Sequence, residues 1–547
     1  MKIYFNETNK KLNKRDFVTI ILIMVIYGIL SFYRLGNKIS PNTFIEEEKG
    51  TVFQIELEKE EDIIKMKAYN GYNNAKYQVY IAKENEKNTY ELVSTVSGKG
   101  SFSWNEERLA KKGKFIQITL LEDSTLGELA FYNNEQKKIP IKRITKNEEE
   151  ISVLTDEEST IPKKSSCLNS TYFDEIYFAR TAYEYAKGKE TFEWTHPPLG
   201  KLIQSIPIKL TKKMTPWNYR LMGNISGILM LLILYLLGKE LFQKRKYAIL
   251  SSLLIALDTF HFTETRIGTI DSHLVLFIMI SIYFMIRYIN SNKRRYFILS
   301  GLFFAFGIAT KWTAFYGGIA LAIIYWVHEI KNKDKLYKTI GYGVVFFIII
   351  PVLFYGGIYR LFPNNKLYET TNIKNIIKQQ QAMYEYHSKL NETHDFSSKW
   401  FTWPISYKPV WYHTATISSD KRETITGVGN IVIWWFGIIS MIIMAIQIIR
   451  KKDKNALILL TIILSLWLPY SFINRIMFLY HYFPVTPFMI LGNVYLLEKI
   501  ETKTKKFIPI YMILVLVFFI LYYPVISGYP VKEEMIEKLR IFSSWYF

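Results

Sequence analysis

Apolar segments long enough to cross a membrane recur along this chain of 547 residues. A spanning helix needs about 20 mostly apolar residues for a hydrocarbon core of about 30 Å. Seven segments approach that length, namely 17–32, 222–237, 273–289, 340–358, 431–449, 477–497 and 508–526. Four shorter or interrupted segments lie at 247–262, 296–310, 313–327 and 456–472. We therefore expect a polytopic α-helical membrane protein with about 11 transmembrane helices.

Basic residues cluster at every second connection between these segments. The clusters lie near 10–15, 239–246, 293–295, 331–338, 450–454 and 499–506. Because Lys and Arg stay on the cytosolic side, this pattern predicts a multi-pass plasma-membrane protein with a cytosolic amino terminus and an extracellular carboxy terminus. Much of the net charge of +21 is then topological, and a nucleic-acid partner is the weaker explanation. The first segment has no small-residue cleavage site after it, so we interpret it as a retained anchor.

Two long polar segments, about 35–219 and 359–429, fall outside the membrane on this topology. Alternation at Tyr77, Val79 and Ile81, and again from Ile116 to Leu120, predicts a small extracellular β-sandwich-like domain. This domain could bind glycan or an acceptor chain, or serve only as a spacer. An amphipathic helix is expected at about 373–390. The predicted organisation is a cytosolic tail and first helix (1–35), the β insert (43–151), a first catalytic outer loop (152–219), helices 2–7 (220–358), a second outer loop (359–429), helices 8–11 (430–526) and an extracellular tail (527–547).

Charged and polar side chains concentrate near the predicted outer ends of the spans. A hydroxyl that attacks a glycosyl phosphate needs a base, and the departing phosphate needs cations or hydrogen-bond donors. Asp174 and Glu175 are the candidates for the base. The candidates for the phosphate side are Lys201, Arg220, Arg266, Arg475 and His481. Because ionisable groups beside a membrane are costly, their common level predicts one active site at the outer surface.

Each of these signals also has a structural interpretation. Adjacent carboxylates often mark a solvated helix face, and His196 before Pro197 can simply shape a turn. Arg266 and Asp271 could form an ion pair at a helix end. Lys311 and Trp312 could be a snorkelling and a belt residue. Asp174, Glu175 and His196 could hold a metal, although their spacing matches no recognised ligand pattern, and Cys167, the only cysteine, has no motif around it.

Several motifs together resemble the protein O-mannosyltransferase family, membrane enzymes of the GT-C class. They begin with Tyr172-Phe-Asp-Glu, His196-Pro-Pro-Leu-Gly-Lys and Arg220-Leu-Met-Gly. They continue in the family's order with Leu257-Asp-Thr-Phe-His, Arg266 through Asp271-Ser-His, Ala309-Thr-Lys-Trp, Tyr386-His, Ser397-Ser-Lys-Trp-Phe-Thr-Trp-Pro and Phe478-Leu-Tyr-His-Tyr-Phe-Pro. The resemblance therefore covers most of the chain from Tyr172 onward.

The resemblance implies inverting transfer of a sugar, mannose in characterised members, from a polyprenyl phosphate to Ser or Thr hydroxyls. Asp174 would be the base, and Glu175 beside it would position acceptor or donor. Arg220 would contact the phosphate, with Lys201 and His481 as neighbours of the donor. His196, Pro197, Asp271, Trp400 and Trp403 belong to the family motifs, and we assign them to the motif and acceptor side of the site.

Two departures from the family pattern bear on the acceptor. The β insert is not part of that pattern, and the loop at 359–429 has no room for the β-trefoil module of eukaryotic members. The composition without this module suggests a bacterial enzyme. We expect a polyprenyl-phosphate sugar, membrane lipids and secreted or surface proteins as partners, with no cofactor and no metal. A GT-C transferase that acts on a cell-wall polymer or glycolipid is the alternative, and a transporter with an outer binding domain is a remote one.

Overall fold

The computed structural model describes residues 12–98, 100–331 and 336–547. Lys10, Lys11, Lys333 and Lys335 of the predicted basic clusters lie outside the described residues. The chain forms two compact units, which we describe separately. The first comprises Met1–Arg34, Gly188–Gln204 and Arg220–Phe547, and the second comprises Leu35–Lys187 and Ser205–Tyr219.

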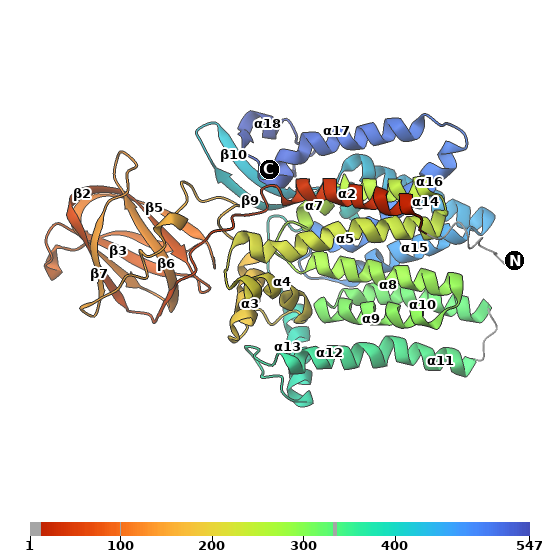
Figure 1. Ribbon diagram of the computed structural model, residues 1–547, viewed down its shortest axis with the longest axis horizontal. Coiled ribbons are helices and arrows are strands. Elements are labelled where there is room, and N and C mark those ends of the chain that lie inside the picture. The colour runs from red at the N-terminus through yellow and green to blue at the C-terminus, as the bar shows by residue number, and fades with distance from the viewer. Residues whose placement is uncertain (1–11, 99, 332–335) are drawn as a thin grey trace. The chain divides into compact units, whose positions relative to one another are not determined.

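Long helices that lie side by side dominate the first unit (Figure 1). In chain order the helices that it contains in full are α2 (Lys14–Phe32), α6 (Arg245–Ala256), α7 (Thr259–Glu264), α8 (Asp271–Ser291), α9 (Arg294–Thr310), α10 (Ala314–Lys331), α11 (Leu336–Val344), η3 (Val345–Ile349), α12 (Ile350–Leu361), α13 (Ile373–Lys389), η4 (Trp400–Ile405), α14 (Ile431–Lys451), α15 (Lys454–Trp467), η5 (Leu468–Phe472), η6 (Leu479–Val485), α16 (Thr486–Glu501), α17 (Phe507–Ser527) and α18 (Glu533–Glu537). Most of α5 (Pro216–Phe242) also belongs to it, and α4 (Leu199–Thr211) begins in it. These elements form a multi-pass membrane body.

Seven helical segments of the described chain are long and apolar enough to cross a membrane. They are Lys14–Phe32, Pro216–Phe242, Asp271–Ser291, Leu336–Leu361, Ile431–Lys451, Lys454–Phe472 and Phe507–Ser527. The other predicted spans coincide with the shorter helices α6 to α7, α9, α10 and α16. Helices thus occur at every predicted position, while the total of eleven spans stays a prediction.

Breaks in these helices place polar residues inside the unit. The predicted span 247–262 is interrupted at Asp258, whose carboxylate accepts the backbone N–H of His261 and so caps α7. The predicted span 477–497 begins with η6, a 3₁₀ segment containing Pro484, rather than with α-helix. α9 ends at Lys311, which has extended backbone angles.

Ion pairs join the basic connections that the sequence places on one side of the membrane. Asp16 at the start of α2 accepts hydrogen bonds from Tyr235 (2.6 Å) and Lys239 (3.4 Å). The further pairs are Lys244–Glu498 (3.4 Å), Lys246–Glu501, Arg287–Glu240 (2.8 Å) and Lys499–Asp453 (3.3 Å). These connections therefore share one end of the helical unit.

The opposite end of the helical unit carries its non-spanning elements (Figure 1). β9 (Val410–Thr416), β10 (Lys421–Gly427) and β11 (Val531–Lys532) form a small antiparallel sheet there. The helix α13 confirms the predicted amphipathic helix, and it lies at the same end, whereas α11 lies at the other. Ile373, Ile377 and Tyr384 on α13 are exposed, as expected of a helix that lies at a membrane surface.

A β domain forms most of the second unit, as predicted for 43–151. Its strands are β1 (Ile45–Glu47), β2 (Val52–Asn70), β3 (Lys76–Ala82), β4 (Glu91–Ser97), β5 (Trp104–Leu120), β6 (Ser124–Tyr132), β7 (Ile141–Lys146) and β8 (Glu149–Glu150), with short 3₁₀ turns η1 (Lys87–Thr89) and η2 (Glu158–Thr160). The strands β1 to β8 all belong to one eight-stranded sheet, so the predicted sandwich-like domain takes the form of a single curled sheet.

The length of β2 explains how one sheet encloses a core. One edge of β2 pairs with β5, while its other edge pairs with β7 near Phe53 and with β6 near Lys65. The pairing of β2 with β5 shifts between Glu56 and Glu61, and such irregularities bend and twist a strand. The curled sheet buries an apolar core that includes Phe53, Ile118 and Phe131.

A second core joins the β domain to α3 (Glu175–Lys187). Tyr69, Phe102 and Trp104 of the sheet pack with Ala182 and Tyr183 of this helix. The helix that follows Asp174 therefore rests on the β domain inside one compact unit.

Candidate active site

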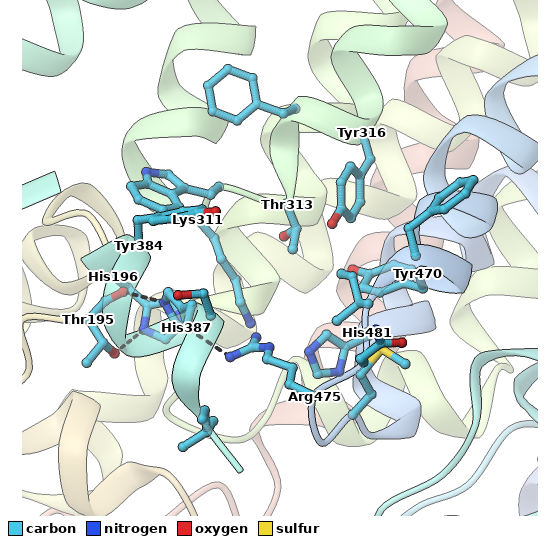
Figure 2. A pocket seen from close by; sticks show the side chains of 18 of the residues that line it. Thr195, His196, Lys311, Thr313, Tyr316, Tyr384, His387, Tyr470, Arg475 and His481 are labelled. Carbon is cyan, nitrogen blue, oxygen red and sulfur yellow. Dashed lines mark hydrogen bonds between the residues drawn. The ribbon is translucent and has the colours of Figure 1, made fainter. Parts of the chain in front are cut away.

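A cavity of about 800 Å³ opens in the helical unit, at the junctions of its helices. The walls come from the turn at 195–197, the break between α9 and α10, the carboxy-terminal end of α13, and the segment from 470 to 481. One part of the lining is cationic and rich in histidine, and another part is apolar. Figure 2 shows Lys311 and Arg475 extending into the space between His387 and His481.

Lys311 enters the cavity because α9 ends there. The side chain is mostly buried, and its Nζ donates to Asp271 Oδ1 at 2.8 Å. The ammonium also lies 5.4 Å from the centre of the Tyr480 ring. The bond to Asp271 fixes the position of the ammonium and uses one of its three N–H donors. Lys311 can therefore also donate to an anion in the cavity.

Arg475 supplies a second cation from the loop before η6. Its Nη1 lies 2.8 Å from His387 Nδ1, and the structure records no carboxylate pair for it in the described part of the chain. His387 Nε2 lies 2.8 Å from the backbone oxygen of Thr195. Since a carbonyl only accepts and a guanidinium only donates, His387 is neutral with its proton on Nε2. Burial, helped by the charges of His196 and Arg475, lowers the pKa of His387 to about 4.

A buried glutamate, Glu193, organises the turn that carries His196. Glu193 Oε1 accepts hydrogen bonds from the Thr195 backbone (2.8 Å), the Thr195 hydroxyl and His196 Nδ1 (3.1 Å). Burial alone raises the pKa of Glu193, but the opposing charges of Lys201 and His196 hold it well below its usual range. The carboxylate is thus ionised and accepts a hydrogen bond from His196 Nδ1–H, which leaves His196 Nε2 with a lone pair when the ring is neutral.

Lys201 lies behind this turn and is itself buried. Its ammonium donates to Glu193 Oε2, to the Glu193 carbonyl (2.8 Å) and to the His196 carbonyl (2.8 Å). Three acceptors match the three protons of an ammonium. The structure therefore shows Lys201 holding the His196 turn, and a role for it in phosphate binding stays a prediction.

Aromatic rings surround His481 at the far side of the cavity. The imidazole stacks on Trp403 at 6.0 Å and on Tyr480 at 4.6 Å between ring centres. Trp403 is fully buried, and its indole N–H donates to Ser398 Oγ at 3.0 Å. Trp400 packs on Trp467 at 5.6 Å. His481 therefore reaches the cavity, while the two tryptophans support the segment around it.

The alternative interpretation of Arg266 and Asp271 as a mutual ion pair is wrong. Asp271 pairs with Lys311, as described above. Arg266 instead donates to the backbone oxygens of Ser31 (3.0 Å), Tyr33 (2.9 Å) and Arg34 (2.9 Å). A cation there is stabilised by the carboxy-terminal dipole of α2. Arg266 does not line the cavity.

The remaining predicted residues occupy two other places. Arg220 is buried on α5. Asp174 is half-buried and directly precedes α3, where its carbonyl accepts the backbone N–H groups of Tyr177 (3.0 Å) and Phe178 (3.1 Å). Glu175 is fully buried, and its carboxylate accepts the Tyr172 backbone N–H at 3.1 Å, which caps the start of α3.

The sequence analysis did not identify Glu193 and His387 as members of the site. It also gave Lys311 no role in binding the sugar donor. Glu193 lies three residues before His196, a spacing that carries no established signal. His387 belongs to the Tyr386-His motif, which was the available signal, but no role was assigned to it. Lys311 interrupts an apolar run, and that interruption was the available signal.

The cavity gives no metal-binding group in the described chain. No three His, Cys, Asp or Glu side chains that line it bring their ligand atoms within 4.8 Å of one another. The lining carries three cations, Lys311, Lys389 and Arg475, of which Lys389 is exposed and paired with Glu385.

The helical unit and its cavity define the class of protein, a multi-spanning membrane protein with the GT-C fold. Residues 195–355 match the family "Dolichyl-phosphate-mannose-protein mannosyltransferase", and residues 372–545 match the "C-terminal four TMM region of protein-O-mannosyltransferase". Together the two matches cover more than half of the chain, and the chain belongs to the protein O-mannosyltransferase family.

Relatives and a solved structure agree with this assignment. A polyprenol-phosphate-mannose–protein mannosyltransferase of Corynebacterium glutamicum is 20% identical over 64% of this chain and 81% of its own length. The enzyme of the same name from Mycobacterium tuberculosis is 19% identical over 66% of this chain and 84% of its own length. The Saccharomyces cerevisiae protein O-mannosyltransferase Pmt1-Pmt2 complex bound to the sugar donor has a TM-score of 0.59, with 14% identity over 69% of this chain and 89% of that chain.

Proposed function

We propose that this protein is an inverting glycosyltransferase that moves mannose from a polyprenyl phosphate to Ser or Thr hydroxyls of secreted or surface proteins. The names of the bacterial relatives describe polyprenol-phosphate mannose as the donor and a protein as the acceptor. The observation that carries the proposal for this chain is the cavity in which Lys311 and Arg475 stand beside an apolar wall. A lipid-linked phosphate presents the matching combination of negative charge and hydrocarbon.

The donor would bind with its phosphate between the two cations. Lys311 provides a point charge, and the planar guanidinium of Arg475 provides paired donors that suit phosphate oxygens. The prenyl chain would follow the exposed aromatic side chains of Phe315, Tyr384 and Phe472. His481 lines the same space, so we retain it with Arg475 as a donor-side residue. Donor roles for Lys201, Arg220 and Arg266 stay predictions.

The reaction would be a single displacement at the anomeric carbon. The acceptor oxygen forms a bond to this carbon as the bond to the phosphate oxygen breaks, which inverts the configuration. The hydroxyl proton passes to a general base, for which Asp174 stays the prediction. Lys311 and Arg475 stabilise the charge on the released polyprenyl phosphate. Glu175 positions Asp174 by capping α3. The two cations supply the charge that a metal would otherwise provide, so we propose that no metal or cofactor takes part.

We also propose that the cavity faces outward and that the amino terminus is cytosolic. The ion-paired basic connections at one end of the helical unit suit the cytosolic side. The amphipathic helix α13, which lies at the other end, suits the outer membrane surface. Cysteine labelling of intact cells at Lys389→Cys and at Lys452→Cys tests this, because only the first should react with an impermeant reagent.

Transfer by purified protein tests the function directly. Wild-type protein, Asp174→Asn and Asp174→Glu are incubated with a panel of polyprenyl-phosphate sugars and a Ser/Thr-rich peptide, with and without EDTA. We expect transfer of mannose by the wild type, unchanged by EDTA, and a loss of more than about 100-fold in Asp174→Asn with donor binding retained. Donor binding without transfer to any peptide would favour the cell-wall polymer or glycolipid as acceptor. A lack of donor binding would contradict the glycosyltransferase assignment.

A further inference from the structure

Hydrogen bonds join the β domain to residues 165–171, which directly precede the segment that carries Asp174. The Trp104 backbone N–H donates to Ser170 Oγ at 3.0 Å, and the Ser165 hydroxyl donates to the Trp104 carbonyl at 3.2 Å. The Thr171 backbone N–H and hydroxyl donate to the carbonyls of Phe102 (3.2 Å) and Ser101 (2.5 Å). Residues 165–171 are thus bonded to Trp104 at the start of β5 and to Ser101 and Phe102 in the turn before it.

The β domain also contacts α3 itself, through Arg180 and Tyr183. Arg180 Nη2 donates to Asn73 Oδ1 at 2.7 Å, and its guanidinium lies 5.8 Å from the centre of the Tyr72 ring. Tyr183, one turn further along, packs on Tyr72 at 5.8 Å and on Phe102 at 5.2 Å between ring centres. Charge-assisted and aromatic contacts of this kind fix the rotation of a helix as well as its position.

At Gly100 the β domain closely approaches α3. Its φ of +125° is a backbone conformation that residues with side chains rarely adopt. A Cβ atom at this position would lie 2.6 Å from Ile176 Cγ2, well inside van der Waals contact. Ile176 is two residues after Asp174, so any shift that relieves this clash displaces the residue proposed as the base.

We infer that the inserted β domain is a positioning module for Asp174, and that Asn73 and Gly100 are its positioning residues. The inference rests on the proposed function, since it takes Asp174 to be the base. The segment before Asp174 is bonded to Trp104 and to the turn before it, and the helix after Asp174 packs on residues 72–73 and 100–104. Asp174 itself is tied to α3 through its carbonyl. The domain therefore acts on the reaction through the location of one carboxylate.

Steady-state kinetics of Asn73→Ala, Asn73→Asp and Gly100→Ala test the inference in the full-length protein. A displaced base lowers kcat without weakening donor binding, because a shift of about 1 Å can cost about 100-fold in rate. We expect kcat to fall at least about fivefold in Asn73→Ala and about 10- to 100-fold in Gly100→Ala. Asn73→Asp, which keeps an acceptor for Arg180, should restore most of the rate. The dissociation constant and the stoichiometry of donor binding should match the wild type.

Asn133→Ala is the matched control. Asn133 Oδ1 accepts the backbone N–H groups of Glu135 (3.0 Å) and Lys137 (3.1 Å) in the turn between β6 and β7, and its side chain makes no recorded bond to α3. The Asn133→Ala variant also loses hydrogen bonds within the β domain, but these bonds do not involve α3. Its kcat should therefore stay at the wild-type value.

The possible results separate the two proposals. Wild-type kcat in both Asn73→Ala and Gly100→Ala, or a loss of rate that follows a loss of donor-binding stoichiometry, overturns the positioning role. An equal loss in Asn133→Ala also overturns it, because the effect would then be general instability. If Asp174→Asn keeps full turnover, the proposed base is wrong and the positioning role fails with it. An inactive Asp174→Asn beside a fully active Asn73→Ala and Gly100→Ala rejects the positioning role alone.

Discussion

Arg475 donates a hydrogen bond of 2.8 Å from Nη1 to Nδ1 of His387, and the other ring nitrogen of His387 lies 2.8 Å from the Thr195 carbonyl. A neutral imidazole therefore bridges a cation of the cavity and the turn that carries His196. No carboxylate of residues 12–98, 100–331 or 336–547 is recorded as an ion-pair partner of Arg475, so its charge is preserved for a bound anion.

Replacement of this cation should weaken donor binding. Hydrogen bonds to charged groups contribute about 1.5–3 kcal/mol, so Arg475→Gln should raise the dissociation constant of a polyprenyl-phosphate donor about 10- to 100-fold. Lys389→Gln is the control, because Lys389 also borders the cavity but is exposed and paired with Glu385 at 3.3 Å. Equal affinity in the two variants would argue against phosphate binding at Arg475.

The lowered pKa of His387 predicts an acid-sensitive contribution to stability. Its pKa of about 4 lies below the ordinary value of 6.5, so the unfolded chain binds more protons between these values. Stability contributed by this group is complete above pH 6.5 and is lost as the pH falls toward 4. Thermal unfolding of His387→Gln should therefore depend less on pH between 6.5 and 4 than that of the wild type. The exposed His394, replaced by Gln, should leave the wild-type dependence unchanged.

The buried pair of Lys201 and Glu193 should show strong coupling. Removing one member leaves an uncompensated charge, which typically destabilises a protein by about 3–5 kcal/mol. Lys201→Met and Glu193→Gln should each lower the Tm, and the double variant should lose less than the sum of the two. Melting curves in detergent measure this directly, and strictly additive losses would show that the two residues stabilise the fold independently.

The raised pKa of Glu128 in the β domain predicts a loss of stability as the pH rises, which is opposite to the effect expected from His387. Burial raises its pKa to about 7, above the ordinary 4.5, and Oε1 has no hydrogen-bond partner. The folded state therefore binds more protons between pH 4.5 and 7, and stability is lost as the pH rises through this range. Glu128→Gln should raise the Tm by a few degrees at pH 8 and change it little at pH 4.5. An unchanged Tm at pH 8 would contradict the raised pKa of Glu128.

The membrane body and the β domain were predictable because each depends on local patterns. Apolar length marks spanning helices, and alternation at Tyr77, Val79 and Ile81 marks a strand. The curl of the sheet was not predictable, since it arises where β2 changes partners along one edge and where its register with β5 shifts. No periodicity in a single strand carries information about which partner it will meet.

The site was predictable in part for a similar reason. Arg475, His196 and His481 stood out as polar residues near the ends of apolar segments, and all three line the cavity. The contact of His387 with Thr195 joins residues 192 positions apart, and the bonds from Arg266 to the end of α2 join residues more than 230 apart. Such pairings depend on the tertiary fold, and a composition pattern cannot indicate them.

One backbone hydrogen bond brings the two ends of the β domain together. The Asn37 N–H donates to the Leu168 carbonyl at 2.7 Å, so the chain enters and leaves the β domain at adjacent points. A domain whose two ends lie close together can be inserted without rearranging the host chain at the junction. A different module with equally close ends can therefore replace this one, provided that it presents equivalent loops to the helix that follows Asp174.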